Sequence, residues 1–132
     1  MTMQAPDVME RDEGAIELPR LQLFGVLVGD IDDPRSSTTY PFSYQGNRTK
    51  IVMCTALWRG YISAYLLRAD GRLVLKRAVY PFTPNADPDV VNEELVGDFW
   101  IDLREWFMGC GVRVPFRQGR IVADESEWRT LE

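Results

Sequence analysis

One short motif constrains the fold of this chain more than any other feature: the dipeptide Asp70-Gly71 between two apolar runs. A two-residue turn that includes glycine is typical of a β-hairpin, because both central residues need a positive φ. The runs on either side, Tyr61–Arg68 and Leu73–Tyr80, are rich in aliphatic and aromatic residues. We therefore expect two antiparallel strands joined by this turn.

A second turn of the same kind, Arg59-Gly60, follows a third apolar run, Ile51–Trp58. Side chains alternate between the two faces of a strand, so the two turns can be tested for agreement. With two-residue turns, Leu66 stands opposite Leu75, and both hairpins place aliphatic residues on the same face. The agreement predicts a three-stranded meander whose core face holds Ile51, Met53, Thr55, Leu57, Ile62, Ala64, Leu66, Leu73, Leu75 and Val79, with Arg68 and Arg77 as exceptions.

The segment after the meander carries the signals of a helix. Asp87-Pro88 fits an N-cap followed by proline in the first turn. Acidic residues at Asp98, Asp102 and Glu105 alternate with apolar residues at helical spacing. We expect an amphipathic helix that packs on the sheet through Val96, Phe99, Trp100, Leu103, Trp106 and Phe107.

The length of 132 residues fits one domain, and 45% apolar residues suffice for a core. Residues 1–14 are polar and acidic without periodicity, so they are predicted to be a mobile tail. Leu21–Val28 is typical of a buried strand, and Gln118-Gly119 marks a last hairpin. Residues 15–132 are therefore predicted to form a single α+β domain, mainly an antiparallel sheet of five to six strands with one main helix.

The absence of histidine excludes more chemistry than any other count. It removes Ser-His-Asp and Cys-His nucleophile pairs and most zinc sites. Cys54 and Cys110 do not make a disulfide framework and are predicted to be reduced thiols. Asp30, Asp32 and Asp33 lack the rest of a calcium loop, so solvated turn acids explain them better. We predict no catalytic residue, no metal site and no cofactor.

Aromatic residues gather around the "WRGY" turn. Trp, Tyr and Arg dominate interface hot spots, because they combine a large contact area with a polar group. The structural alternative is a cross-strand aromatic pair that caps the hairpin. The predicted residues for binding a partner or ligand are Trp58, Arg59, Tyr61, Tyr65 and Tyr80.

The net charge of −5 disfavours binding to nucleic acid and favours a basic protein partner. The N-terminus has no basic and apolar signal regions, and no apolar run approaches the length of a membrane span. We therefore expect a cytoplasmic protein that binds neither membranes nor nucleic acid.

Four short motifs resemble a family of small uncharacterised bacterial proteins: "WRGY" at 58–61, "RLVL" at 72–75, "WFMG" at 106–109 and "VRVP" at 112–115. The resemblance covers roughly residues 51–119. It implies a stand-alone, cytoplasmic, β-rich domain without a cofactor. That family has no established activity.

Three function classes follow from these observations. The leading hypothesis is a non-enzymatic protein-binding domain, and its most concrete form is an immunity-type protein that neutralises a bacterial toxin. The second is a small-molecule-binding domain with an aromatic pocket between helix and sheet, lined by Trp58, Tyr61 and Tyr65. The third is an enzyme that uses tyrosine or the predicted helix carboxylates.

Overall fold

The computed structural model describes residues 6–28, 38–39, 61–83, 85–105 and 109–130, and almost all regular structure in these residues is β-sheet. The one helical element among them is the short 3-10 turn η1, Ala123–Glu125. The strands are β1 Val8–Arg11, β2 Gln22–Val28, β3 Thr38–Thr39, β4 Ile62–Leu67, β5 Leu73–Val79, β6 Asp89–Glu94, β7 Phe99–Glu105, β8 Cys110–Arg117, β9 Arg120–Ile121 and β10 Glu127–Thr130.

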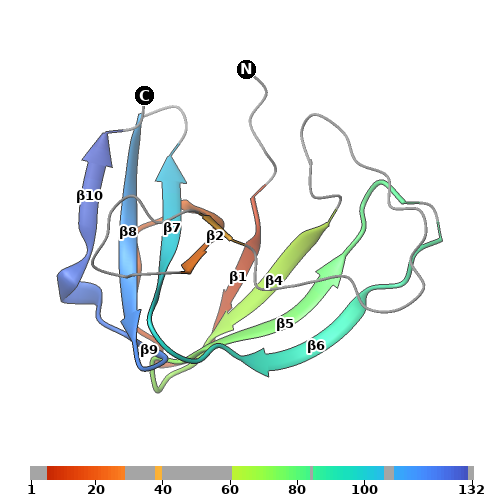
Figure 1. The fold of residues 1–132 in the computed structure, drawn as a ribbon, viewed down its shortest axis with the longest axis horizontal. Coiled ribbons are helices and arrows are strands. Elements are labelled where there is room, and N and C mark those ends of the chain that lie inside the picture. The colour runs from red at the N-terminus through yellow and green to blue at the C-terminus, as the bar shows by residue number, and fades with distance from the viewer. Residues whose placement is uncertain (1–5, 29–37, 40–60, 84, 106–108, 131–132) are drawn as a thin grey trace.

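The strands form two sheets that enclose one core (Figure 1). The four-stranded sheet has the order β1-β4-β5-β6, in which β1 runs parallel to β4 and the other neighbours are antiparallel. The six-stranded sheet has the order β10-β8-β7-β2-β3, and β9 pairs with β8 outside this path. In Figure 1 the two sheets converge toward the lower end of the view, where β5 and β9 meet.

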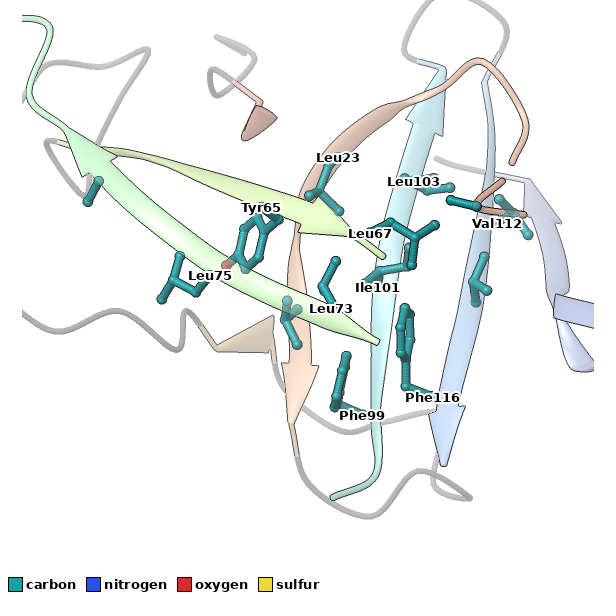
Figure 2. Close-up of a cluster of buried hydrophobic side chains, with 14 of the residues drawn as sticks. Leu23, Tyr65, Leu67, Leu73, Leu75, Phe99, Ile101, Leu103, Val112 and Phe116 are labelled. Atoms are coloured by element: carbon teal, nitrogen blue, oxygen red, sulfur yellow. The ribbon is translucent and has the colours of Figure 1, made fainter. Parts of the chain in front are cut away.

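The core lies between the inner faces of the two sheets (Figure 2). Phe99 of β7 stacks on Phe116 of β8 with ring centroids 4.6 Å apart. Both rings are buried, so this pair anchors the end of the core near the β8–β9 hairpin. The most buried side chains are Val26, Tyr65, Leu67, Leu73, Leu75, Ile101, Leu103, Val112, Val114 and Phe116.

Backbone contacts join the two sheets at two places. The Asp7 N–H donates to the Leu23 carbonyl at 2.7 Å, which ties the start of β1 to β2. The Ile121 N–H donates to the Gly71 carbonyl at 2.9 Å, which ties the β4–β5 turn to β9. Gly71 has a φ of 86°, and a Cβ there would lie 3.2 Å from the Ile121 side chain, so glycine suits both the turn and the close approach.

The predicted hairpin around Asp70-Gly71 is confirmed, but its turn is not the predicted two-residue turn. The Arg68 N–H donates to the Arg72 carbonyl at 2.8 Å, so residues 69–71 form a three-residue loop, in which only Gly71 has a positive φ. Ile62 stands opposite Val79 as expected, but Leu66 stands opposite Val74 and not Leu75. Between these pairs β5 contains one extra residue, which is a β-bulge. The partner strand predicted for residues 51–58 lies outside the described residues.

The predicted core face of this hairpin is half right for β5, and in β4 only Ala64 of the three predicted residues is buried. In β4 the fully buried side chains include Tyr65 and Leu67, whereas Ile62 and Leu66 of the predicted face are half-buried. In β5 the buried residues are Leu73 and Leu75 as expected, and then Ala78 in place of Val79. The three-residue loop shifts the register by one residue next to the turn, so Tyr65 and Leu67 stand opposite Leu75 and Leu73. The bulge reverses this shift farther along β5, where Ala78 is buried.

The predicted amphipathic helix is absent, and the α+β assignment is therefore wrong. Its residues form strands β6 and β7. Strand β7 lies between β2 and β8, and its first five residues are all buried, so apolar residues occupy both of its faces. Its apolar residues also satisfy a helical period, so the sequence pattern of this segment is ambiguous. Trp106 and Phe107 lie outside the described residues.

The predicted N-terminal tail, residues 1–14, contains an ordered strand. Val8–Arg11 forms β1 and pairs with β4, and Asp7 is buried with 5% exposure. The strand predicted at Leu21–Val28 is confirmed as β2. The last hairpin is confirmed too, because Gln118 and Gly119 adopt φ values of 52° and 78° between β8 and β9.

Replacement of Phe116 by alanine should lower the free energy of unfolding by about 3–5 kcal/mol, since it removes a buried ring and its stacked contact with Phe99. Denaturant unfolding followed by circular dichroism measures the change. Val90→Ala is the control, because Val90 is 75% exposed and its loss should change stability by less than about 0.5 kcal/mol. Equal effects of the two substitutions would contradict the assigned core.

Candidate functional site

The structure places the three described aromatic residues of the predicted site inside the molecule. Tyr61, Tyr65 and Tyr80 are 6%, 0% and 5% exposed. The Tyr80 hydroxyl donates a hydrogen bond to Asp89, which links the end of β5 to the start of β6. These tyrosines are core residues and offer no exposed binding face. Trp58 and Arg59 lie outside the described residues.

The helix that would form one wall of the predicted aromatic pocket is strand β7, and Trp58, one of the predicted lining residues, lies outside the described residues. The three carboxylates predicted on the solvated helix face are also separated. Asp98 accepts a hydrogen bond from the Gln118 N–H at 2.8 Å and so fixes the β8–β9 turn. Asp102 and Glu105 are three residues apart on one strand, which places them on opposite faces.

Asp102 is buried, contrary to the solvated position predicted for it, and it forms an ion pair. Its Oδ2 accepts hydrogen bonds from Arg104 Nε at 3.0 Å and Nη2 at 2.8 Å. The Asp102 side chain is 1% exposed and that of Arg104 is 31% exposed. The Arg104 guanidinium also lies 5.7 Å from the centre of the Phe24 ring, a cation–π distance. The Oδ2 of the buried Asp102 accepts both hydrogen bonds from Arg104, so we assign this pair a structural role.

A groove lies between β1 and the segment that leads into β2. Its volume is about 260 Å³. Its apolar surface comes from Met9 of β1 and from Leu18, Leu21 and Leu23. The groove begins where the two strands part, next to the single contact between Asp7 and Leu23.

The walls of the groove are fixed by polar contacts. The Asp7 Oδ1 accepts a hydrogen bond from the Ser63 N–H at 2.9 Å, across 56 residues of sequence. Arg11 donates through Nε to the Ile16 carbonyl at 3.1 Å and through Nη2 to the Ala15 carbonyl at 2.7 Å. The connection after β1 is therefore held against its strand, so the groove is formed before any ligand binds.

The main chain of β1 turns one set of its polar groups toward the groove. The Asp7 N–H points to β2, where it bonds to Leu23, and the Asp12 N–H points to β4, where it bonds to Leu67 at 2.9 Å. Successive residues of a strand direct their N–H and C=O groups to opposite sides. The N–H and C=O groups of Met9 therefore face the groove. Within the described residues, no strand pairs with β1 on that side beyond Asp7.

Comparison with protein-family models, with curated proteins and with solved structures found no match for this chain. The described residues contain no group of three or more cysteine, aspartate or glutamate residues arranged to hold a metal ion. They also contain no helix of sufficient length and apolar character to cross a membrane. Cys110, at the start of β8, is a half-buried free thiol.

The groove was missed in the sequence because its first wall lies in the predicted tail. The signal that could have indicated it is the group of apolar residues Val8, Met9, Ile16 and Leu18 within an otherwise acidic segment. Four apolar residues in this spacing fit neither a helical nor a strand period. The pairing of β1 with a strand far along the chain gives no local pattern either.

Replacement of Asp102 by alanine should lower the free energy of unfolding by about 1–3 kcal/mol, since it leaves the Arg104 guanidinium without its partner. A double-mutant cycle with Arg104→Ala isolates the pair. We expect a coupling energy of about 1 kcal/mol or more, measured by denaturant unfolding. Strict additivity of the two single substitutions would show that the ion pair does not stabilise the fold.

Proposed function

We propose that this protein is a non-enzymatic binding domain that takes an extended segment of a partner protein into the groove between β1 and β2. The observation that carries the proposal is the main chain of Met9, whose N–H and C=O face an open groove beside a strand edge. An extended peptide can add to such an edge through main-chain hydrogen bonds.

The size and lining of the groove favour a peptide over a small molecule. Its volume of about 260 Å³ lies below the ~300–1,000 Å³ of pockets that enclose small ligands. Its apolar side chains could receive the side chains of alternate peptide residues, which point to one face of a strand. The groove thus offers main-chain pairing for affinity and a small apolar surface for specificity.

The charge of the chain supports a basic partner. At −5 the protein would attract a cationic protein from a distance and speed its association. The most specific form of the proposal is a cytoplasmic immunity-type protein that neutralises a basic bacterial toxin. If a gene for a basic toxin domain lies beside this one, we expect the two purified proteins to form a complex that weakens as salt is raised, as titration calorimetry would measure.

The direction of the β1 main chain can be tested with proline substitutions. Met9→Pro removes an N–H that faces the groove, whereas Glu10→Pro removes an N–H that bonds to β4. Relative to alanine at the same position, proline should destabilise the protein by about 1–3 kcal/mol more at residue 10 than at residue 9. Denaturant unfolding of the four variants gives the comparison. A larger loss of stability from proline at residue 9 than at residue 10 would show that the Met9 N–H faces β4 and not the groove.

The binding proposal is tested with a random-peptide phage library selected on the full chain. We expect selected peptides to shift the backbone amide NMR signals of residues 7–11 and 21–23. Met9→Pro should abolish their binding, and Val96→Ala, a 76% exposed position, should leave it unchanged. Peptides that bind Met9→Pro and the wild type equally, or a library that yields no binder, would overturn the proposed site.

A further inference from the structure

The inner face of the six-stranded sheet carries an apolar row that ends on an exposed tryptophan. Cross-strand register aligns Leu23 with Leu103, Leu103 with Val112, and Val112 with Trp128. The first three are no more than 2% exposed, and Figure 2 shows them side by side. Trp128 on β10 is 61% exposed. In this row, the Trp128 side chain has no described apolar neighbour on the side of β10 that faces away from β8.

The outer face of the same three strands carries a row of alternating charge. Asp102 of β7 stands opposite Arg113 of β8, and Arg113 stands opposite Glu127 of β10. Directly opposed charges of unlike sign stabilise neighbouring strands. The next position in this row, beyond Glu127, therefore favours a basic residue.

The edge of β10 is open and regular in the part of the chain that the structure describes. Its four residues pair with β8 without a register shift, and no second strand lies on its other side. Strand β6, an edge strand of the four-stranded sheet, is irregular by comparison. There Asn92 has a φ of 53° and the pairing with β5 shifts register, which is how proteins protect an edge from further pairing. Strand β10 has neither a register shift nor a residue with a positive φ.

We propose that the β10 edge pairs with β10 of a second copy of this chain, antiparallel and centred on Trp128. In this register Trp128 of one copy stands opposite Trp128 of the other and completes the apolar row. Residue 127 of each copy stands opposite residue 129 of the other, a glutamate opposite an arginine. The sequence Glu-Trp-Arg is thus self-complementary about a two-fold axis, as an isologous interface requires.

The proposed interface lies at the β10 edge of the six-stranded sheet, whereas the groove lies between β1 and the segment that leads into β2. Its short strands make it small, and stable complexes usually bury about 1,200–2,000 Å². We therefore expect a reversible dimer whose fraction rises with protein concentration. A sheet that continues across both copies is not needed for either copy to fold, since Trp128 lies outside the core.

The test is sedimentation equilibrium of the full chain over a range of concentrations. Wild-type protein should show a monomer–dimer equilibrium, and Trp128→Ala should weaken it at least tenfold. Arg129→Glu and Glu127→Arg should each be monomeric alone, because each sets like charges opposite one another. An equimolar mixture of these two variants should dimerise again, since the pairs between residues 127 and 129 of the two copies are then opposite in charge. Val90→Ala, on the β6 edge, is the matched control and should behave as wild type.

Three results would overturn the inference. The first is a wild-type protein that stays monomeric at about 1 mM, a concentration at which even weak interfaces associate. The second is a dimer that none of the β10 substitutions affects, which would place the interface elsewhere. The third is a dimer that Trp128→Ala disrupts while the mixed charge variants fail to recover, which would exclude the proposed register. Circular dichroism confirms that each variant is folded.

Discussion

A single extra residue in β5, Lys76 at the bulge, decides whether Arg77 or Ala78 faces the core between the two sheets. In an unbroken strand that buries Leu73 and Leu75, Arg77 would be the next residue to face the core, and an unpaired buried charge costs several kcal/mol. The bulge turns Arg77 outward, where its Nη2 lies 3.0 Å from Oε1 of Glu10 on β1. Ala78 then takes the inward position. The same irregularity therefore completes the core and helps to hold β1 on the sheet.

The sequence predicts the fold correctly where a local signal determines the structure. The prediction is wrong where a strand distant in sequence determines it. Gly71 and Gly119 mark their hairpins through a positive φ, a local property of the backbone that glycine adopts without strain. The basic residue Arg77 on a predicted core face was the available sign of the bulge. The apolar run at Phe99–Glu105 fits a helix and a buried strand equally, and only its position between β2 and β8 decides between them.

The candidate site also depends on contacts between distant residues, which the sequence does not reveal. Residue type suggested that tyrosines near the "WRGY" turn bind a partner, but residue type alone does not report burial, and Tyr65 fills the core. Asp102 carries no local mark of an ion pair, because its burial depends on the strands beside β7. The groove depends on Asp7 and Ser63, which meet only after the sheet has formed. A site formed by residues that are distant in sequence leaves no local pattern from which to predict it.

The parallel pairing of β1 with β4 also has a consequence for the order of folding. Asp7 and Ser63 are 56 residues apart, so at a synthesis rate of ~5–20 residues per second β1 leaves the ribosome about 3–11 s before its partner. Loop closure over such a distance is slow compared with hairpin formation. The β4–β5 and β7–β8 hairpins can form as soon as they are made. The strand that is synthesised first is therefore incorporated late, and until then the edge of β4 that it covers stays open.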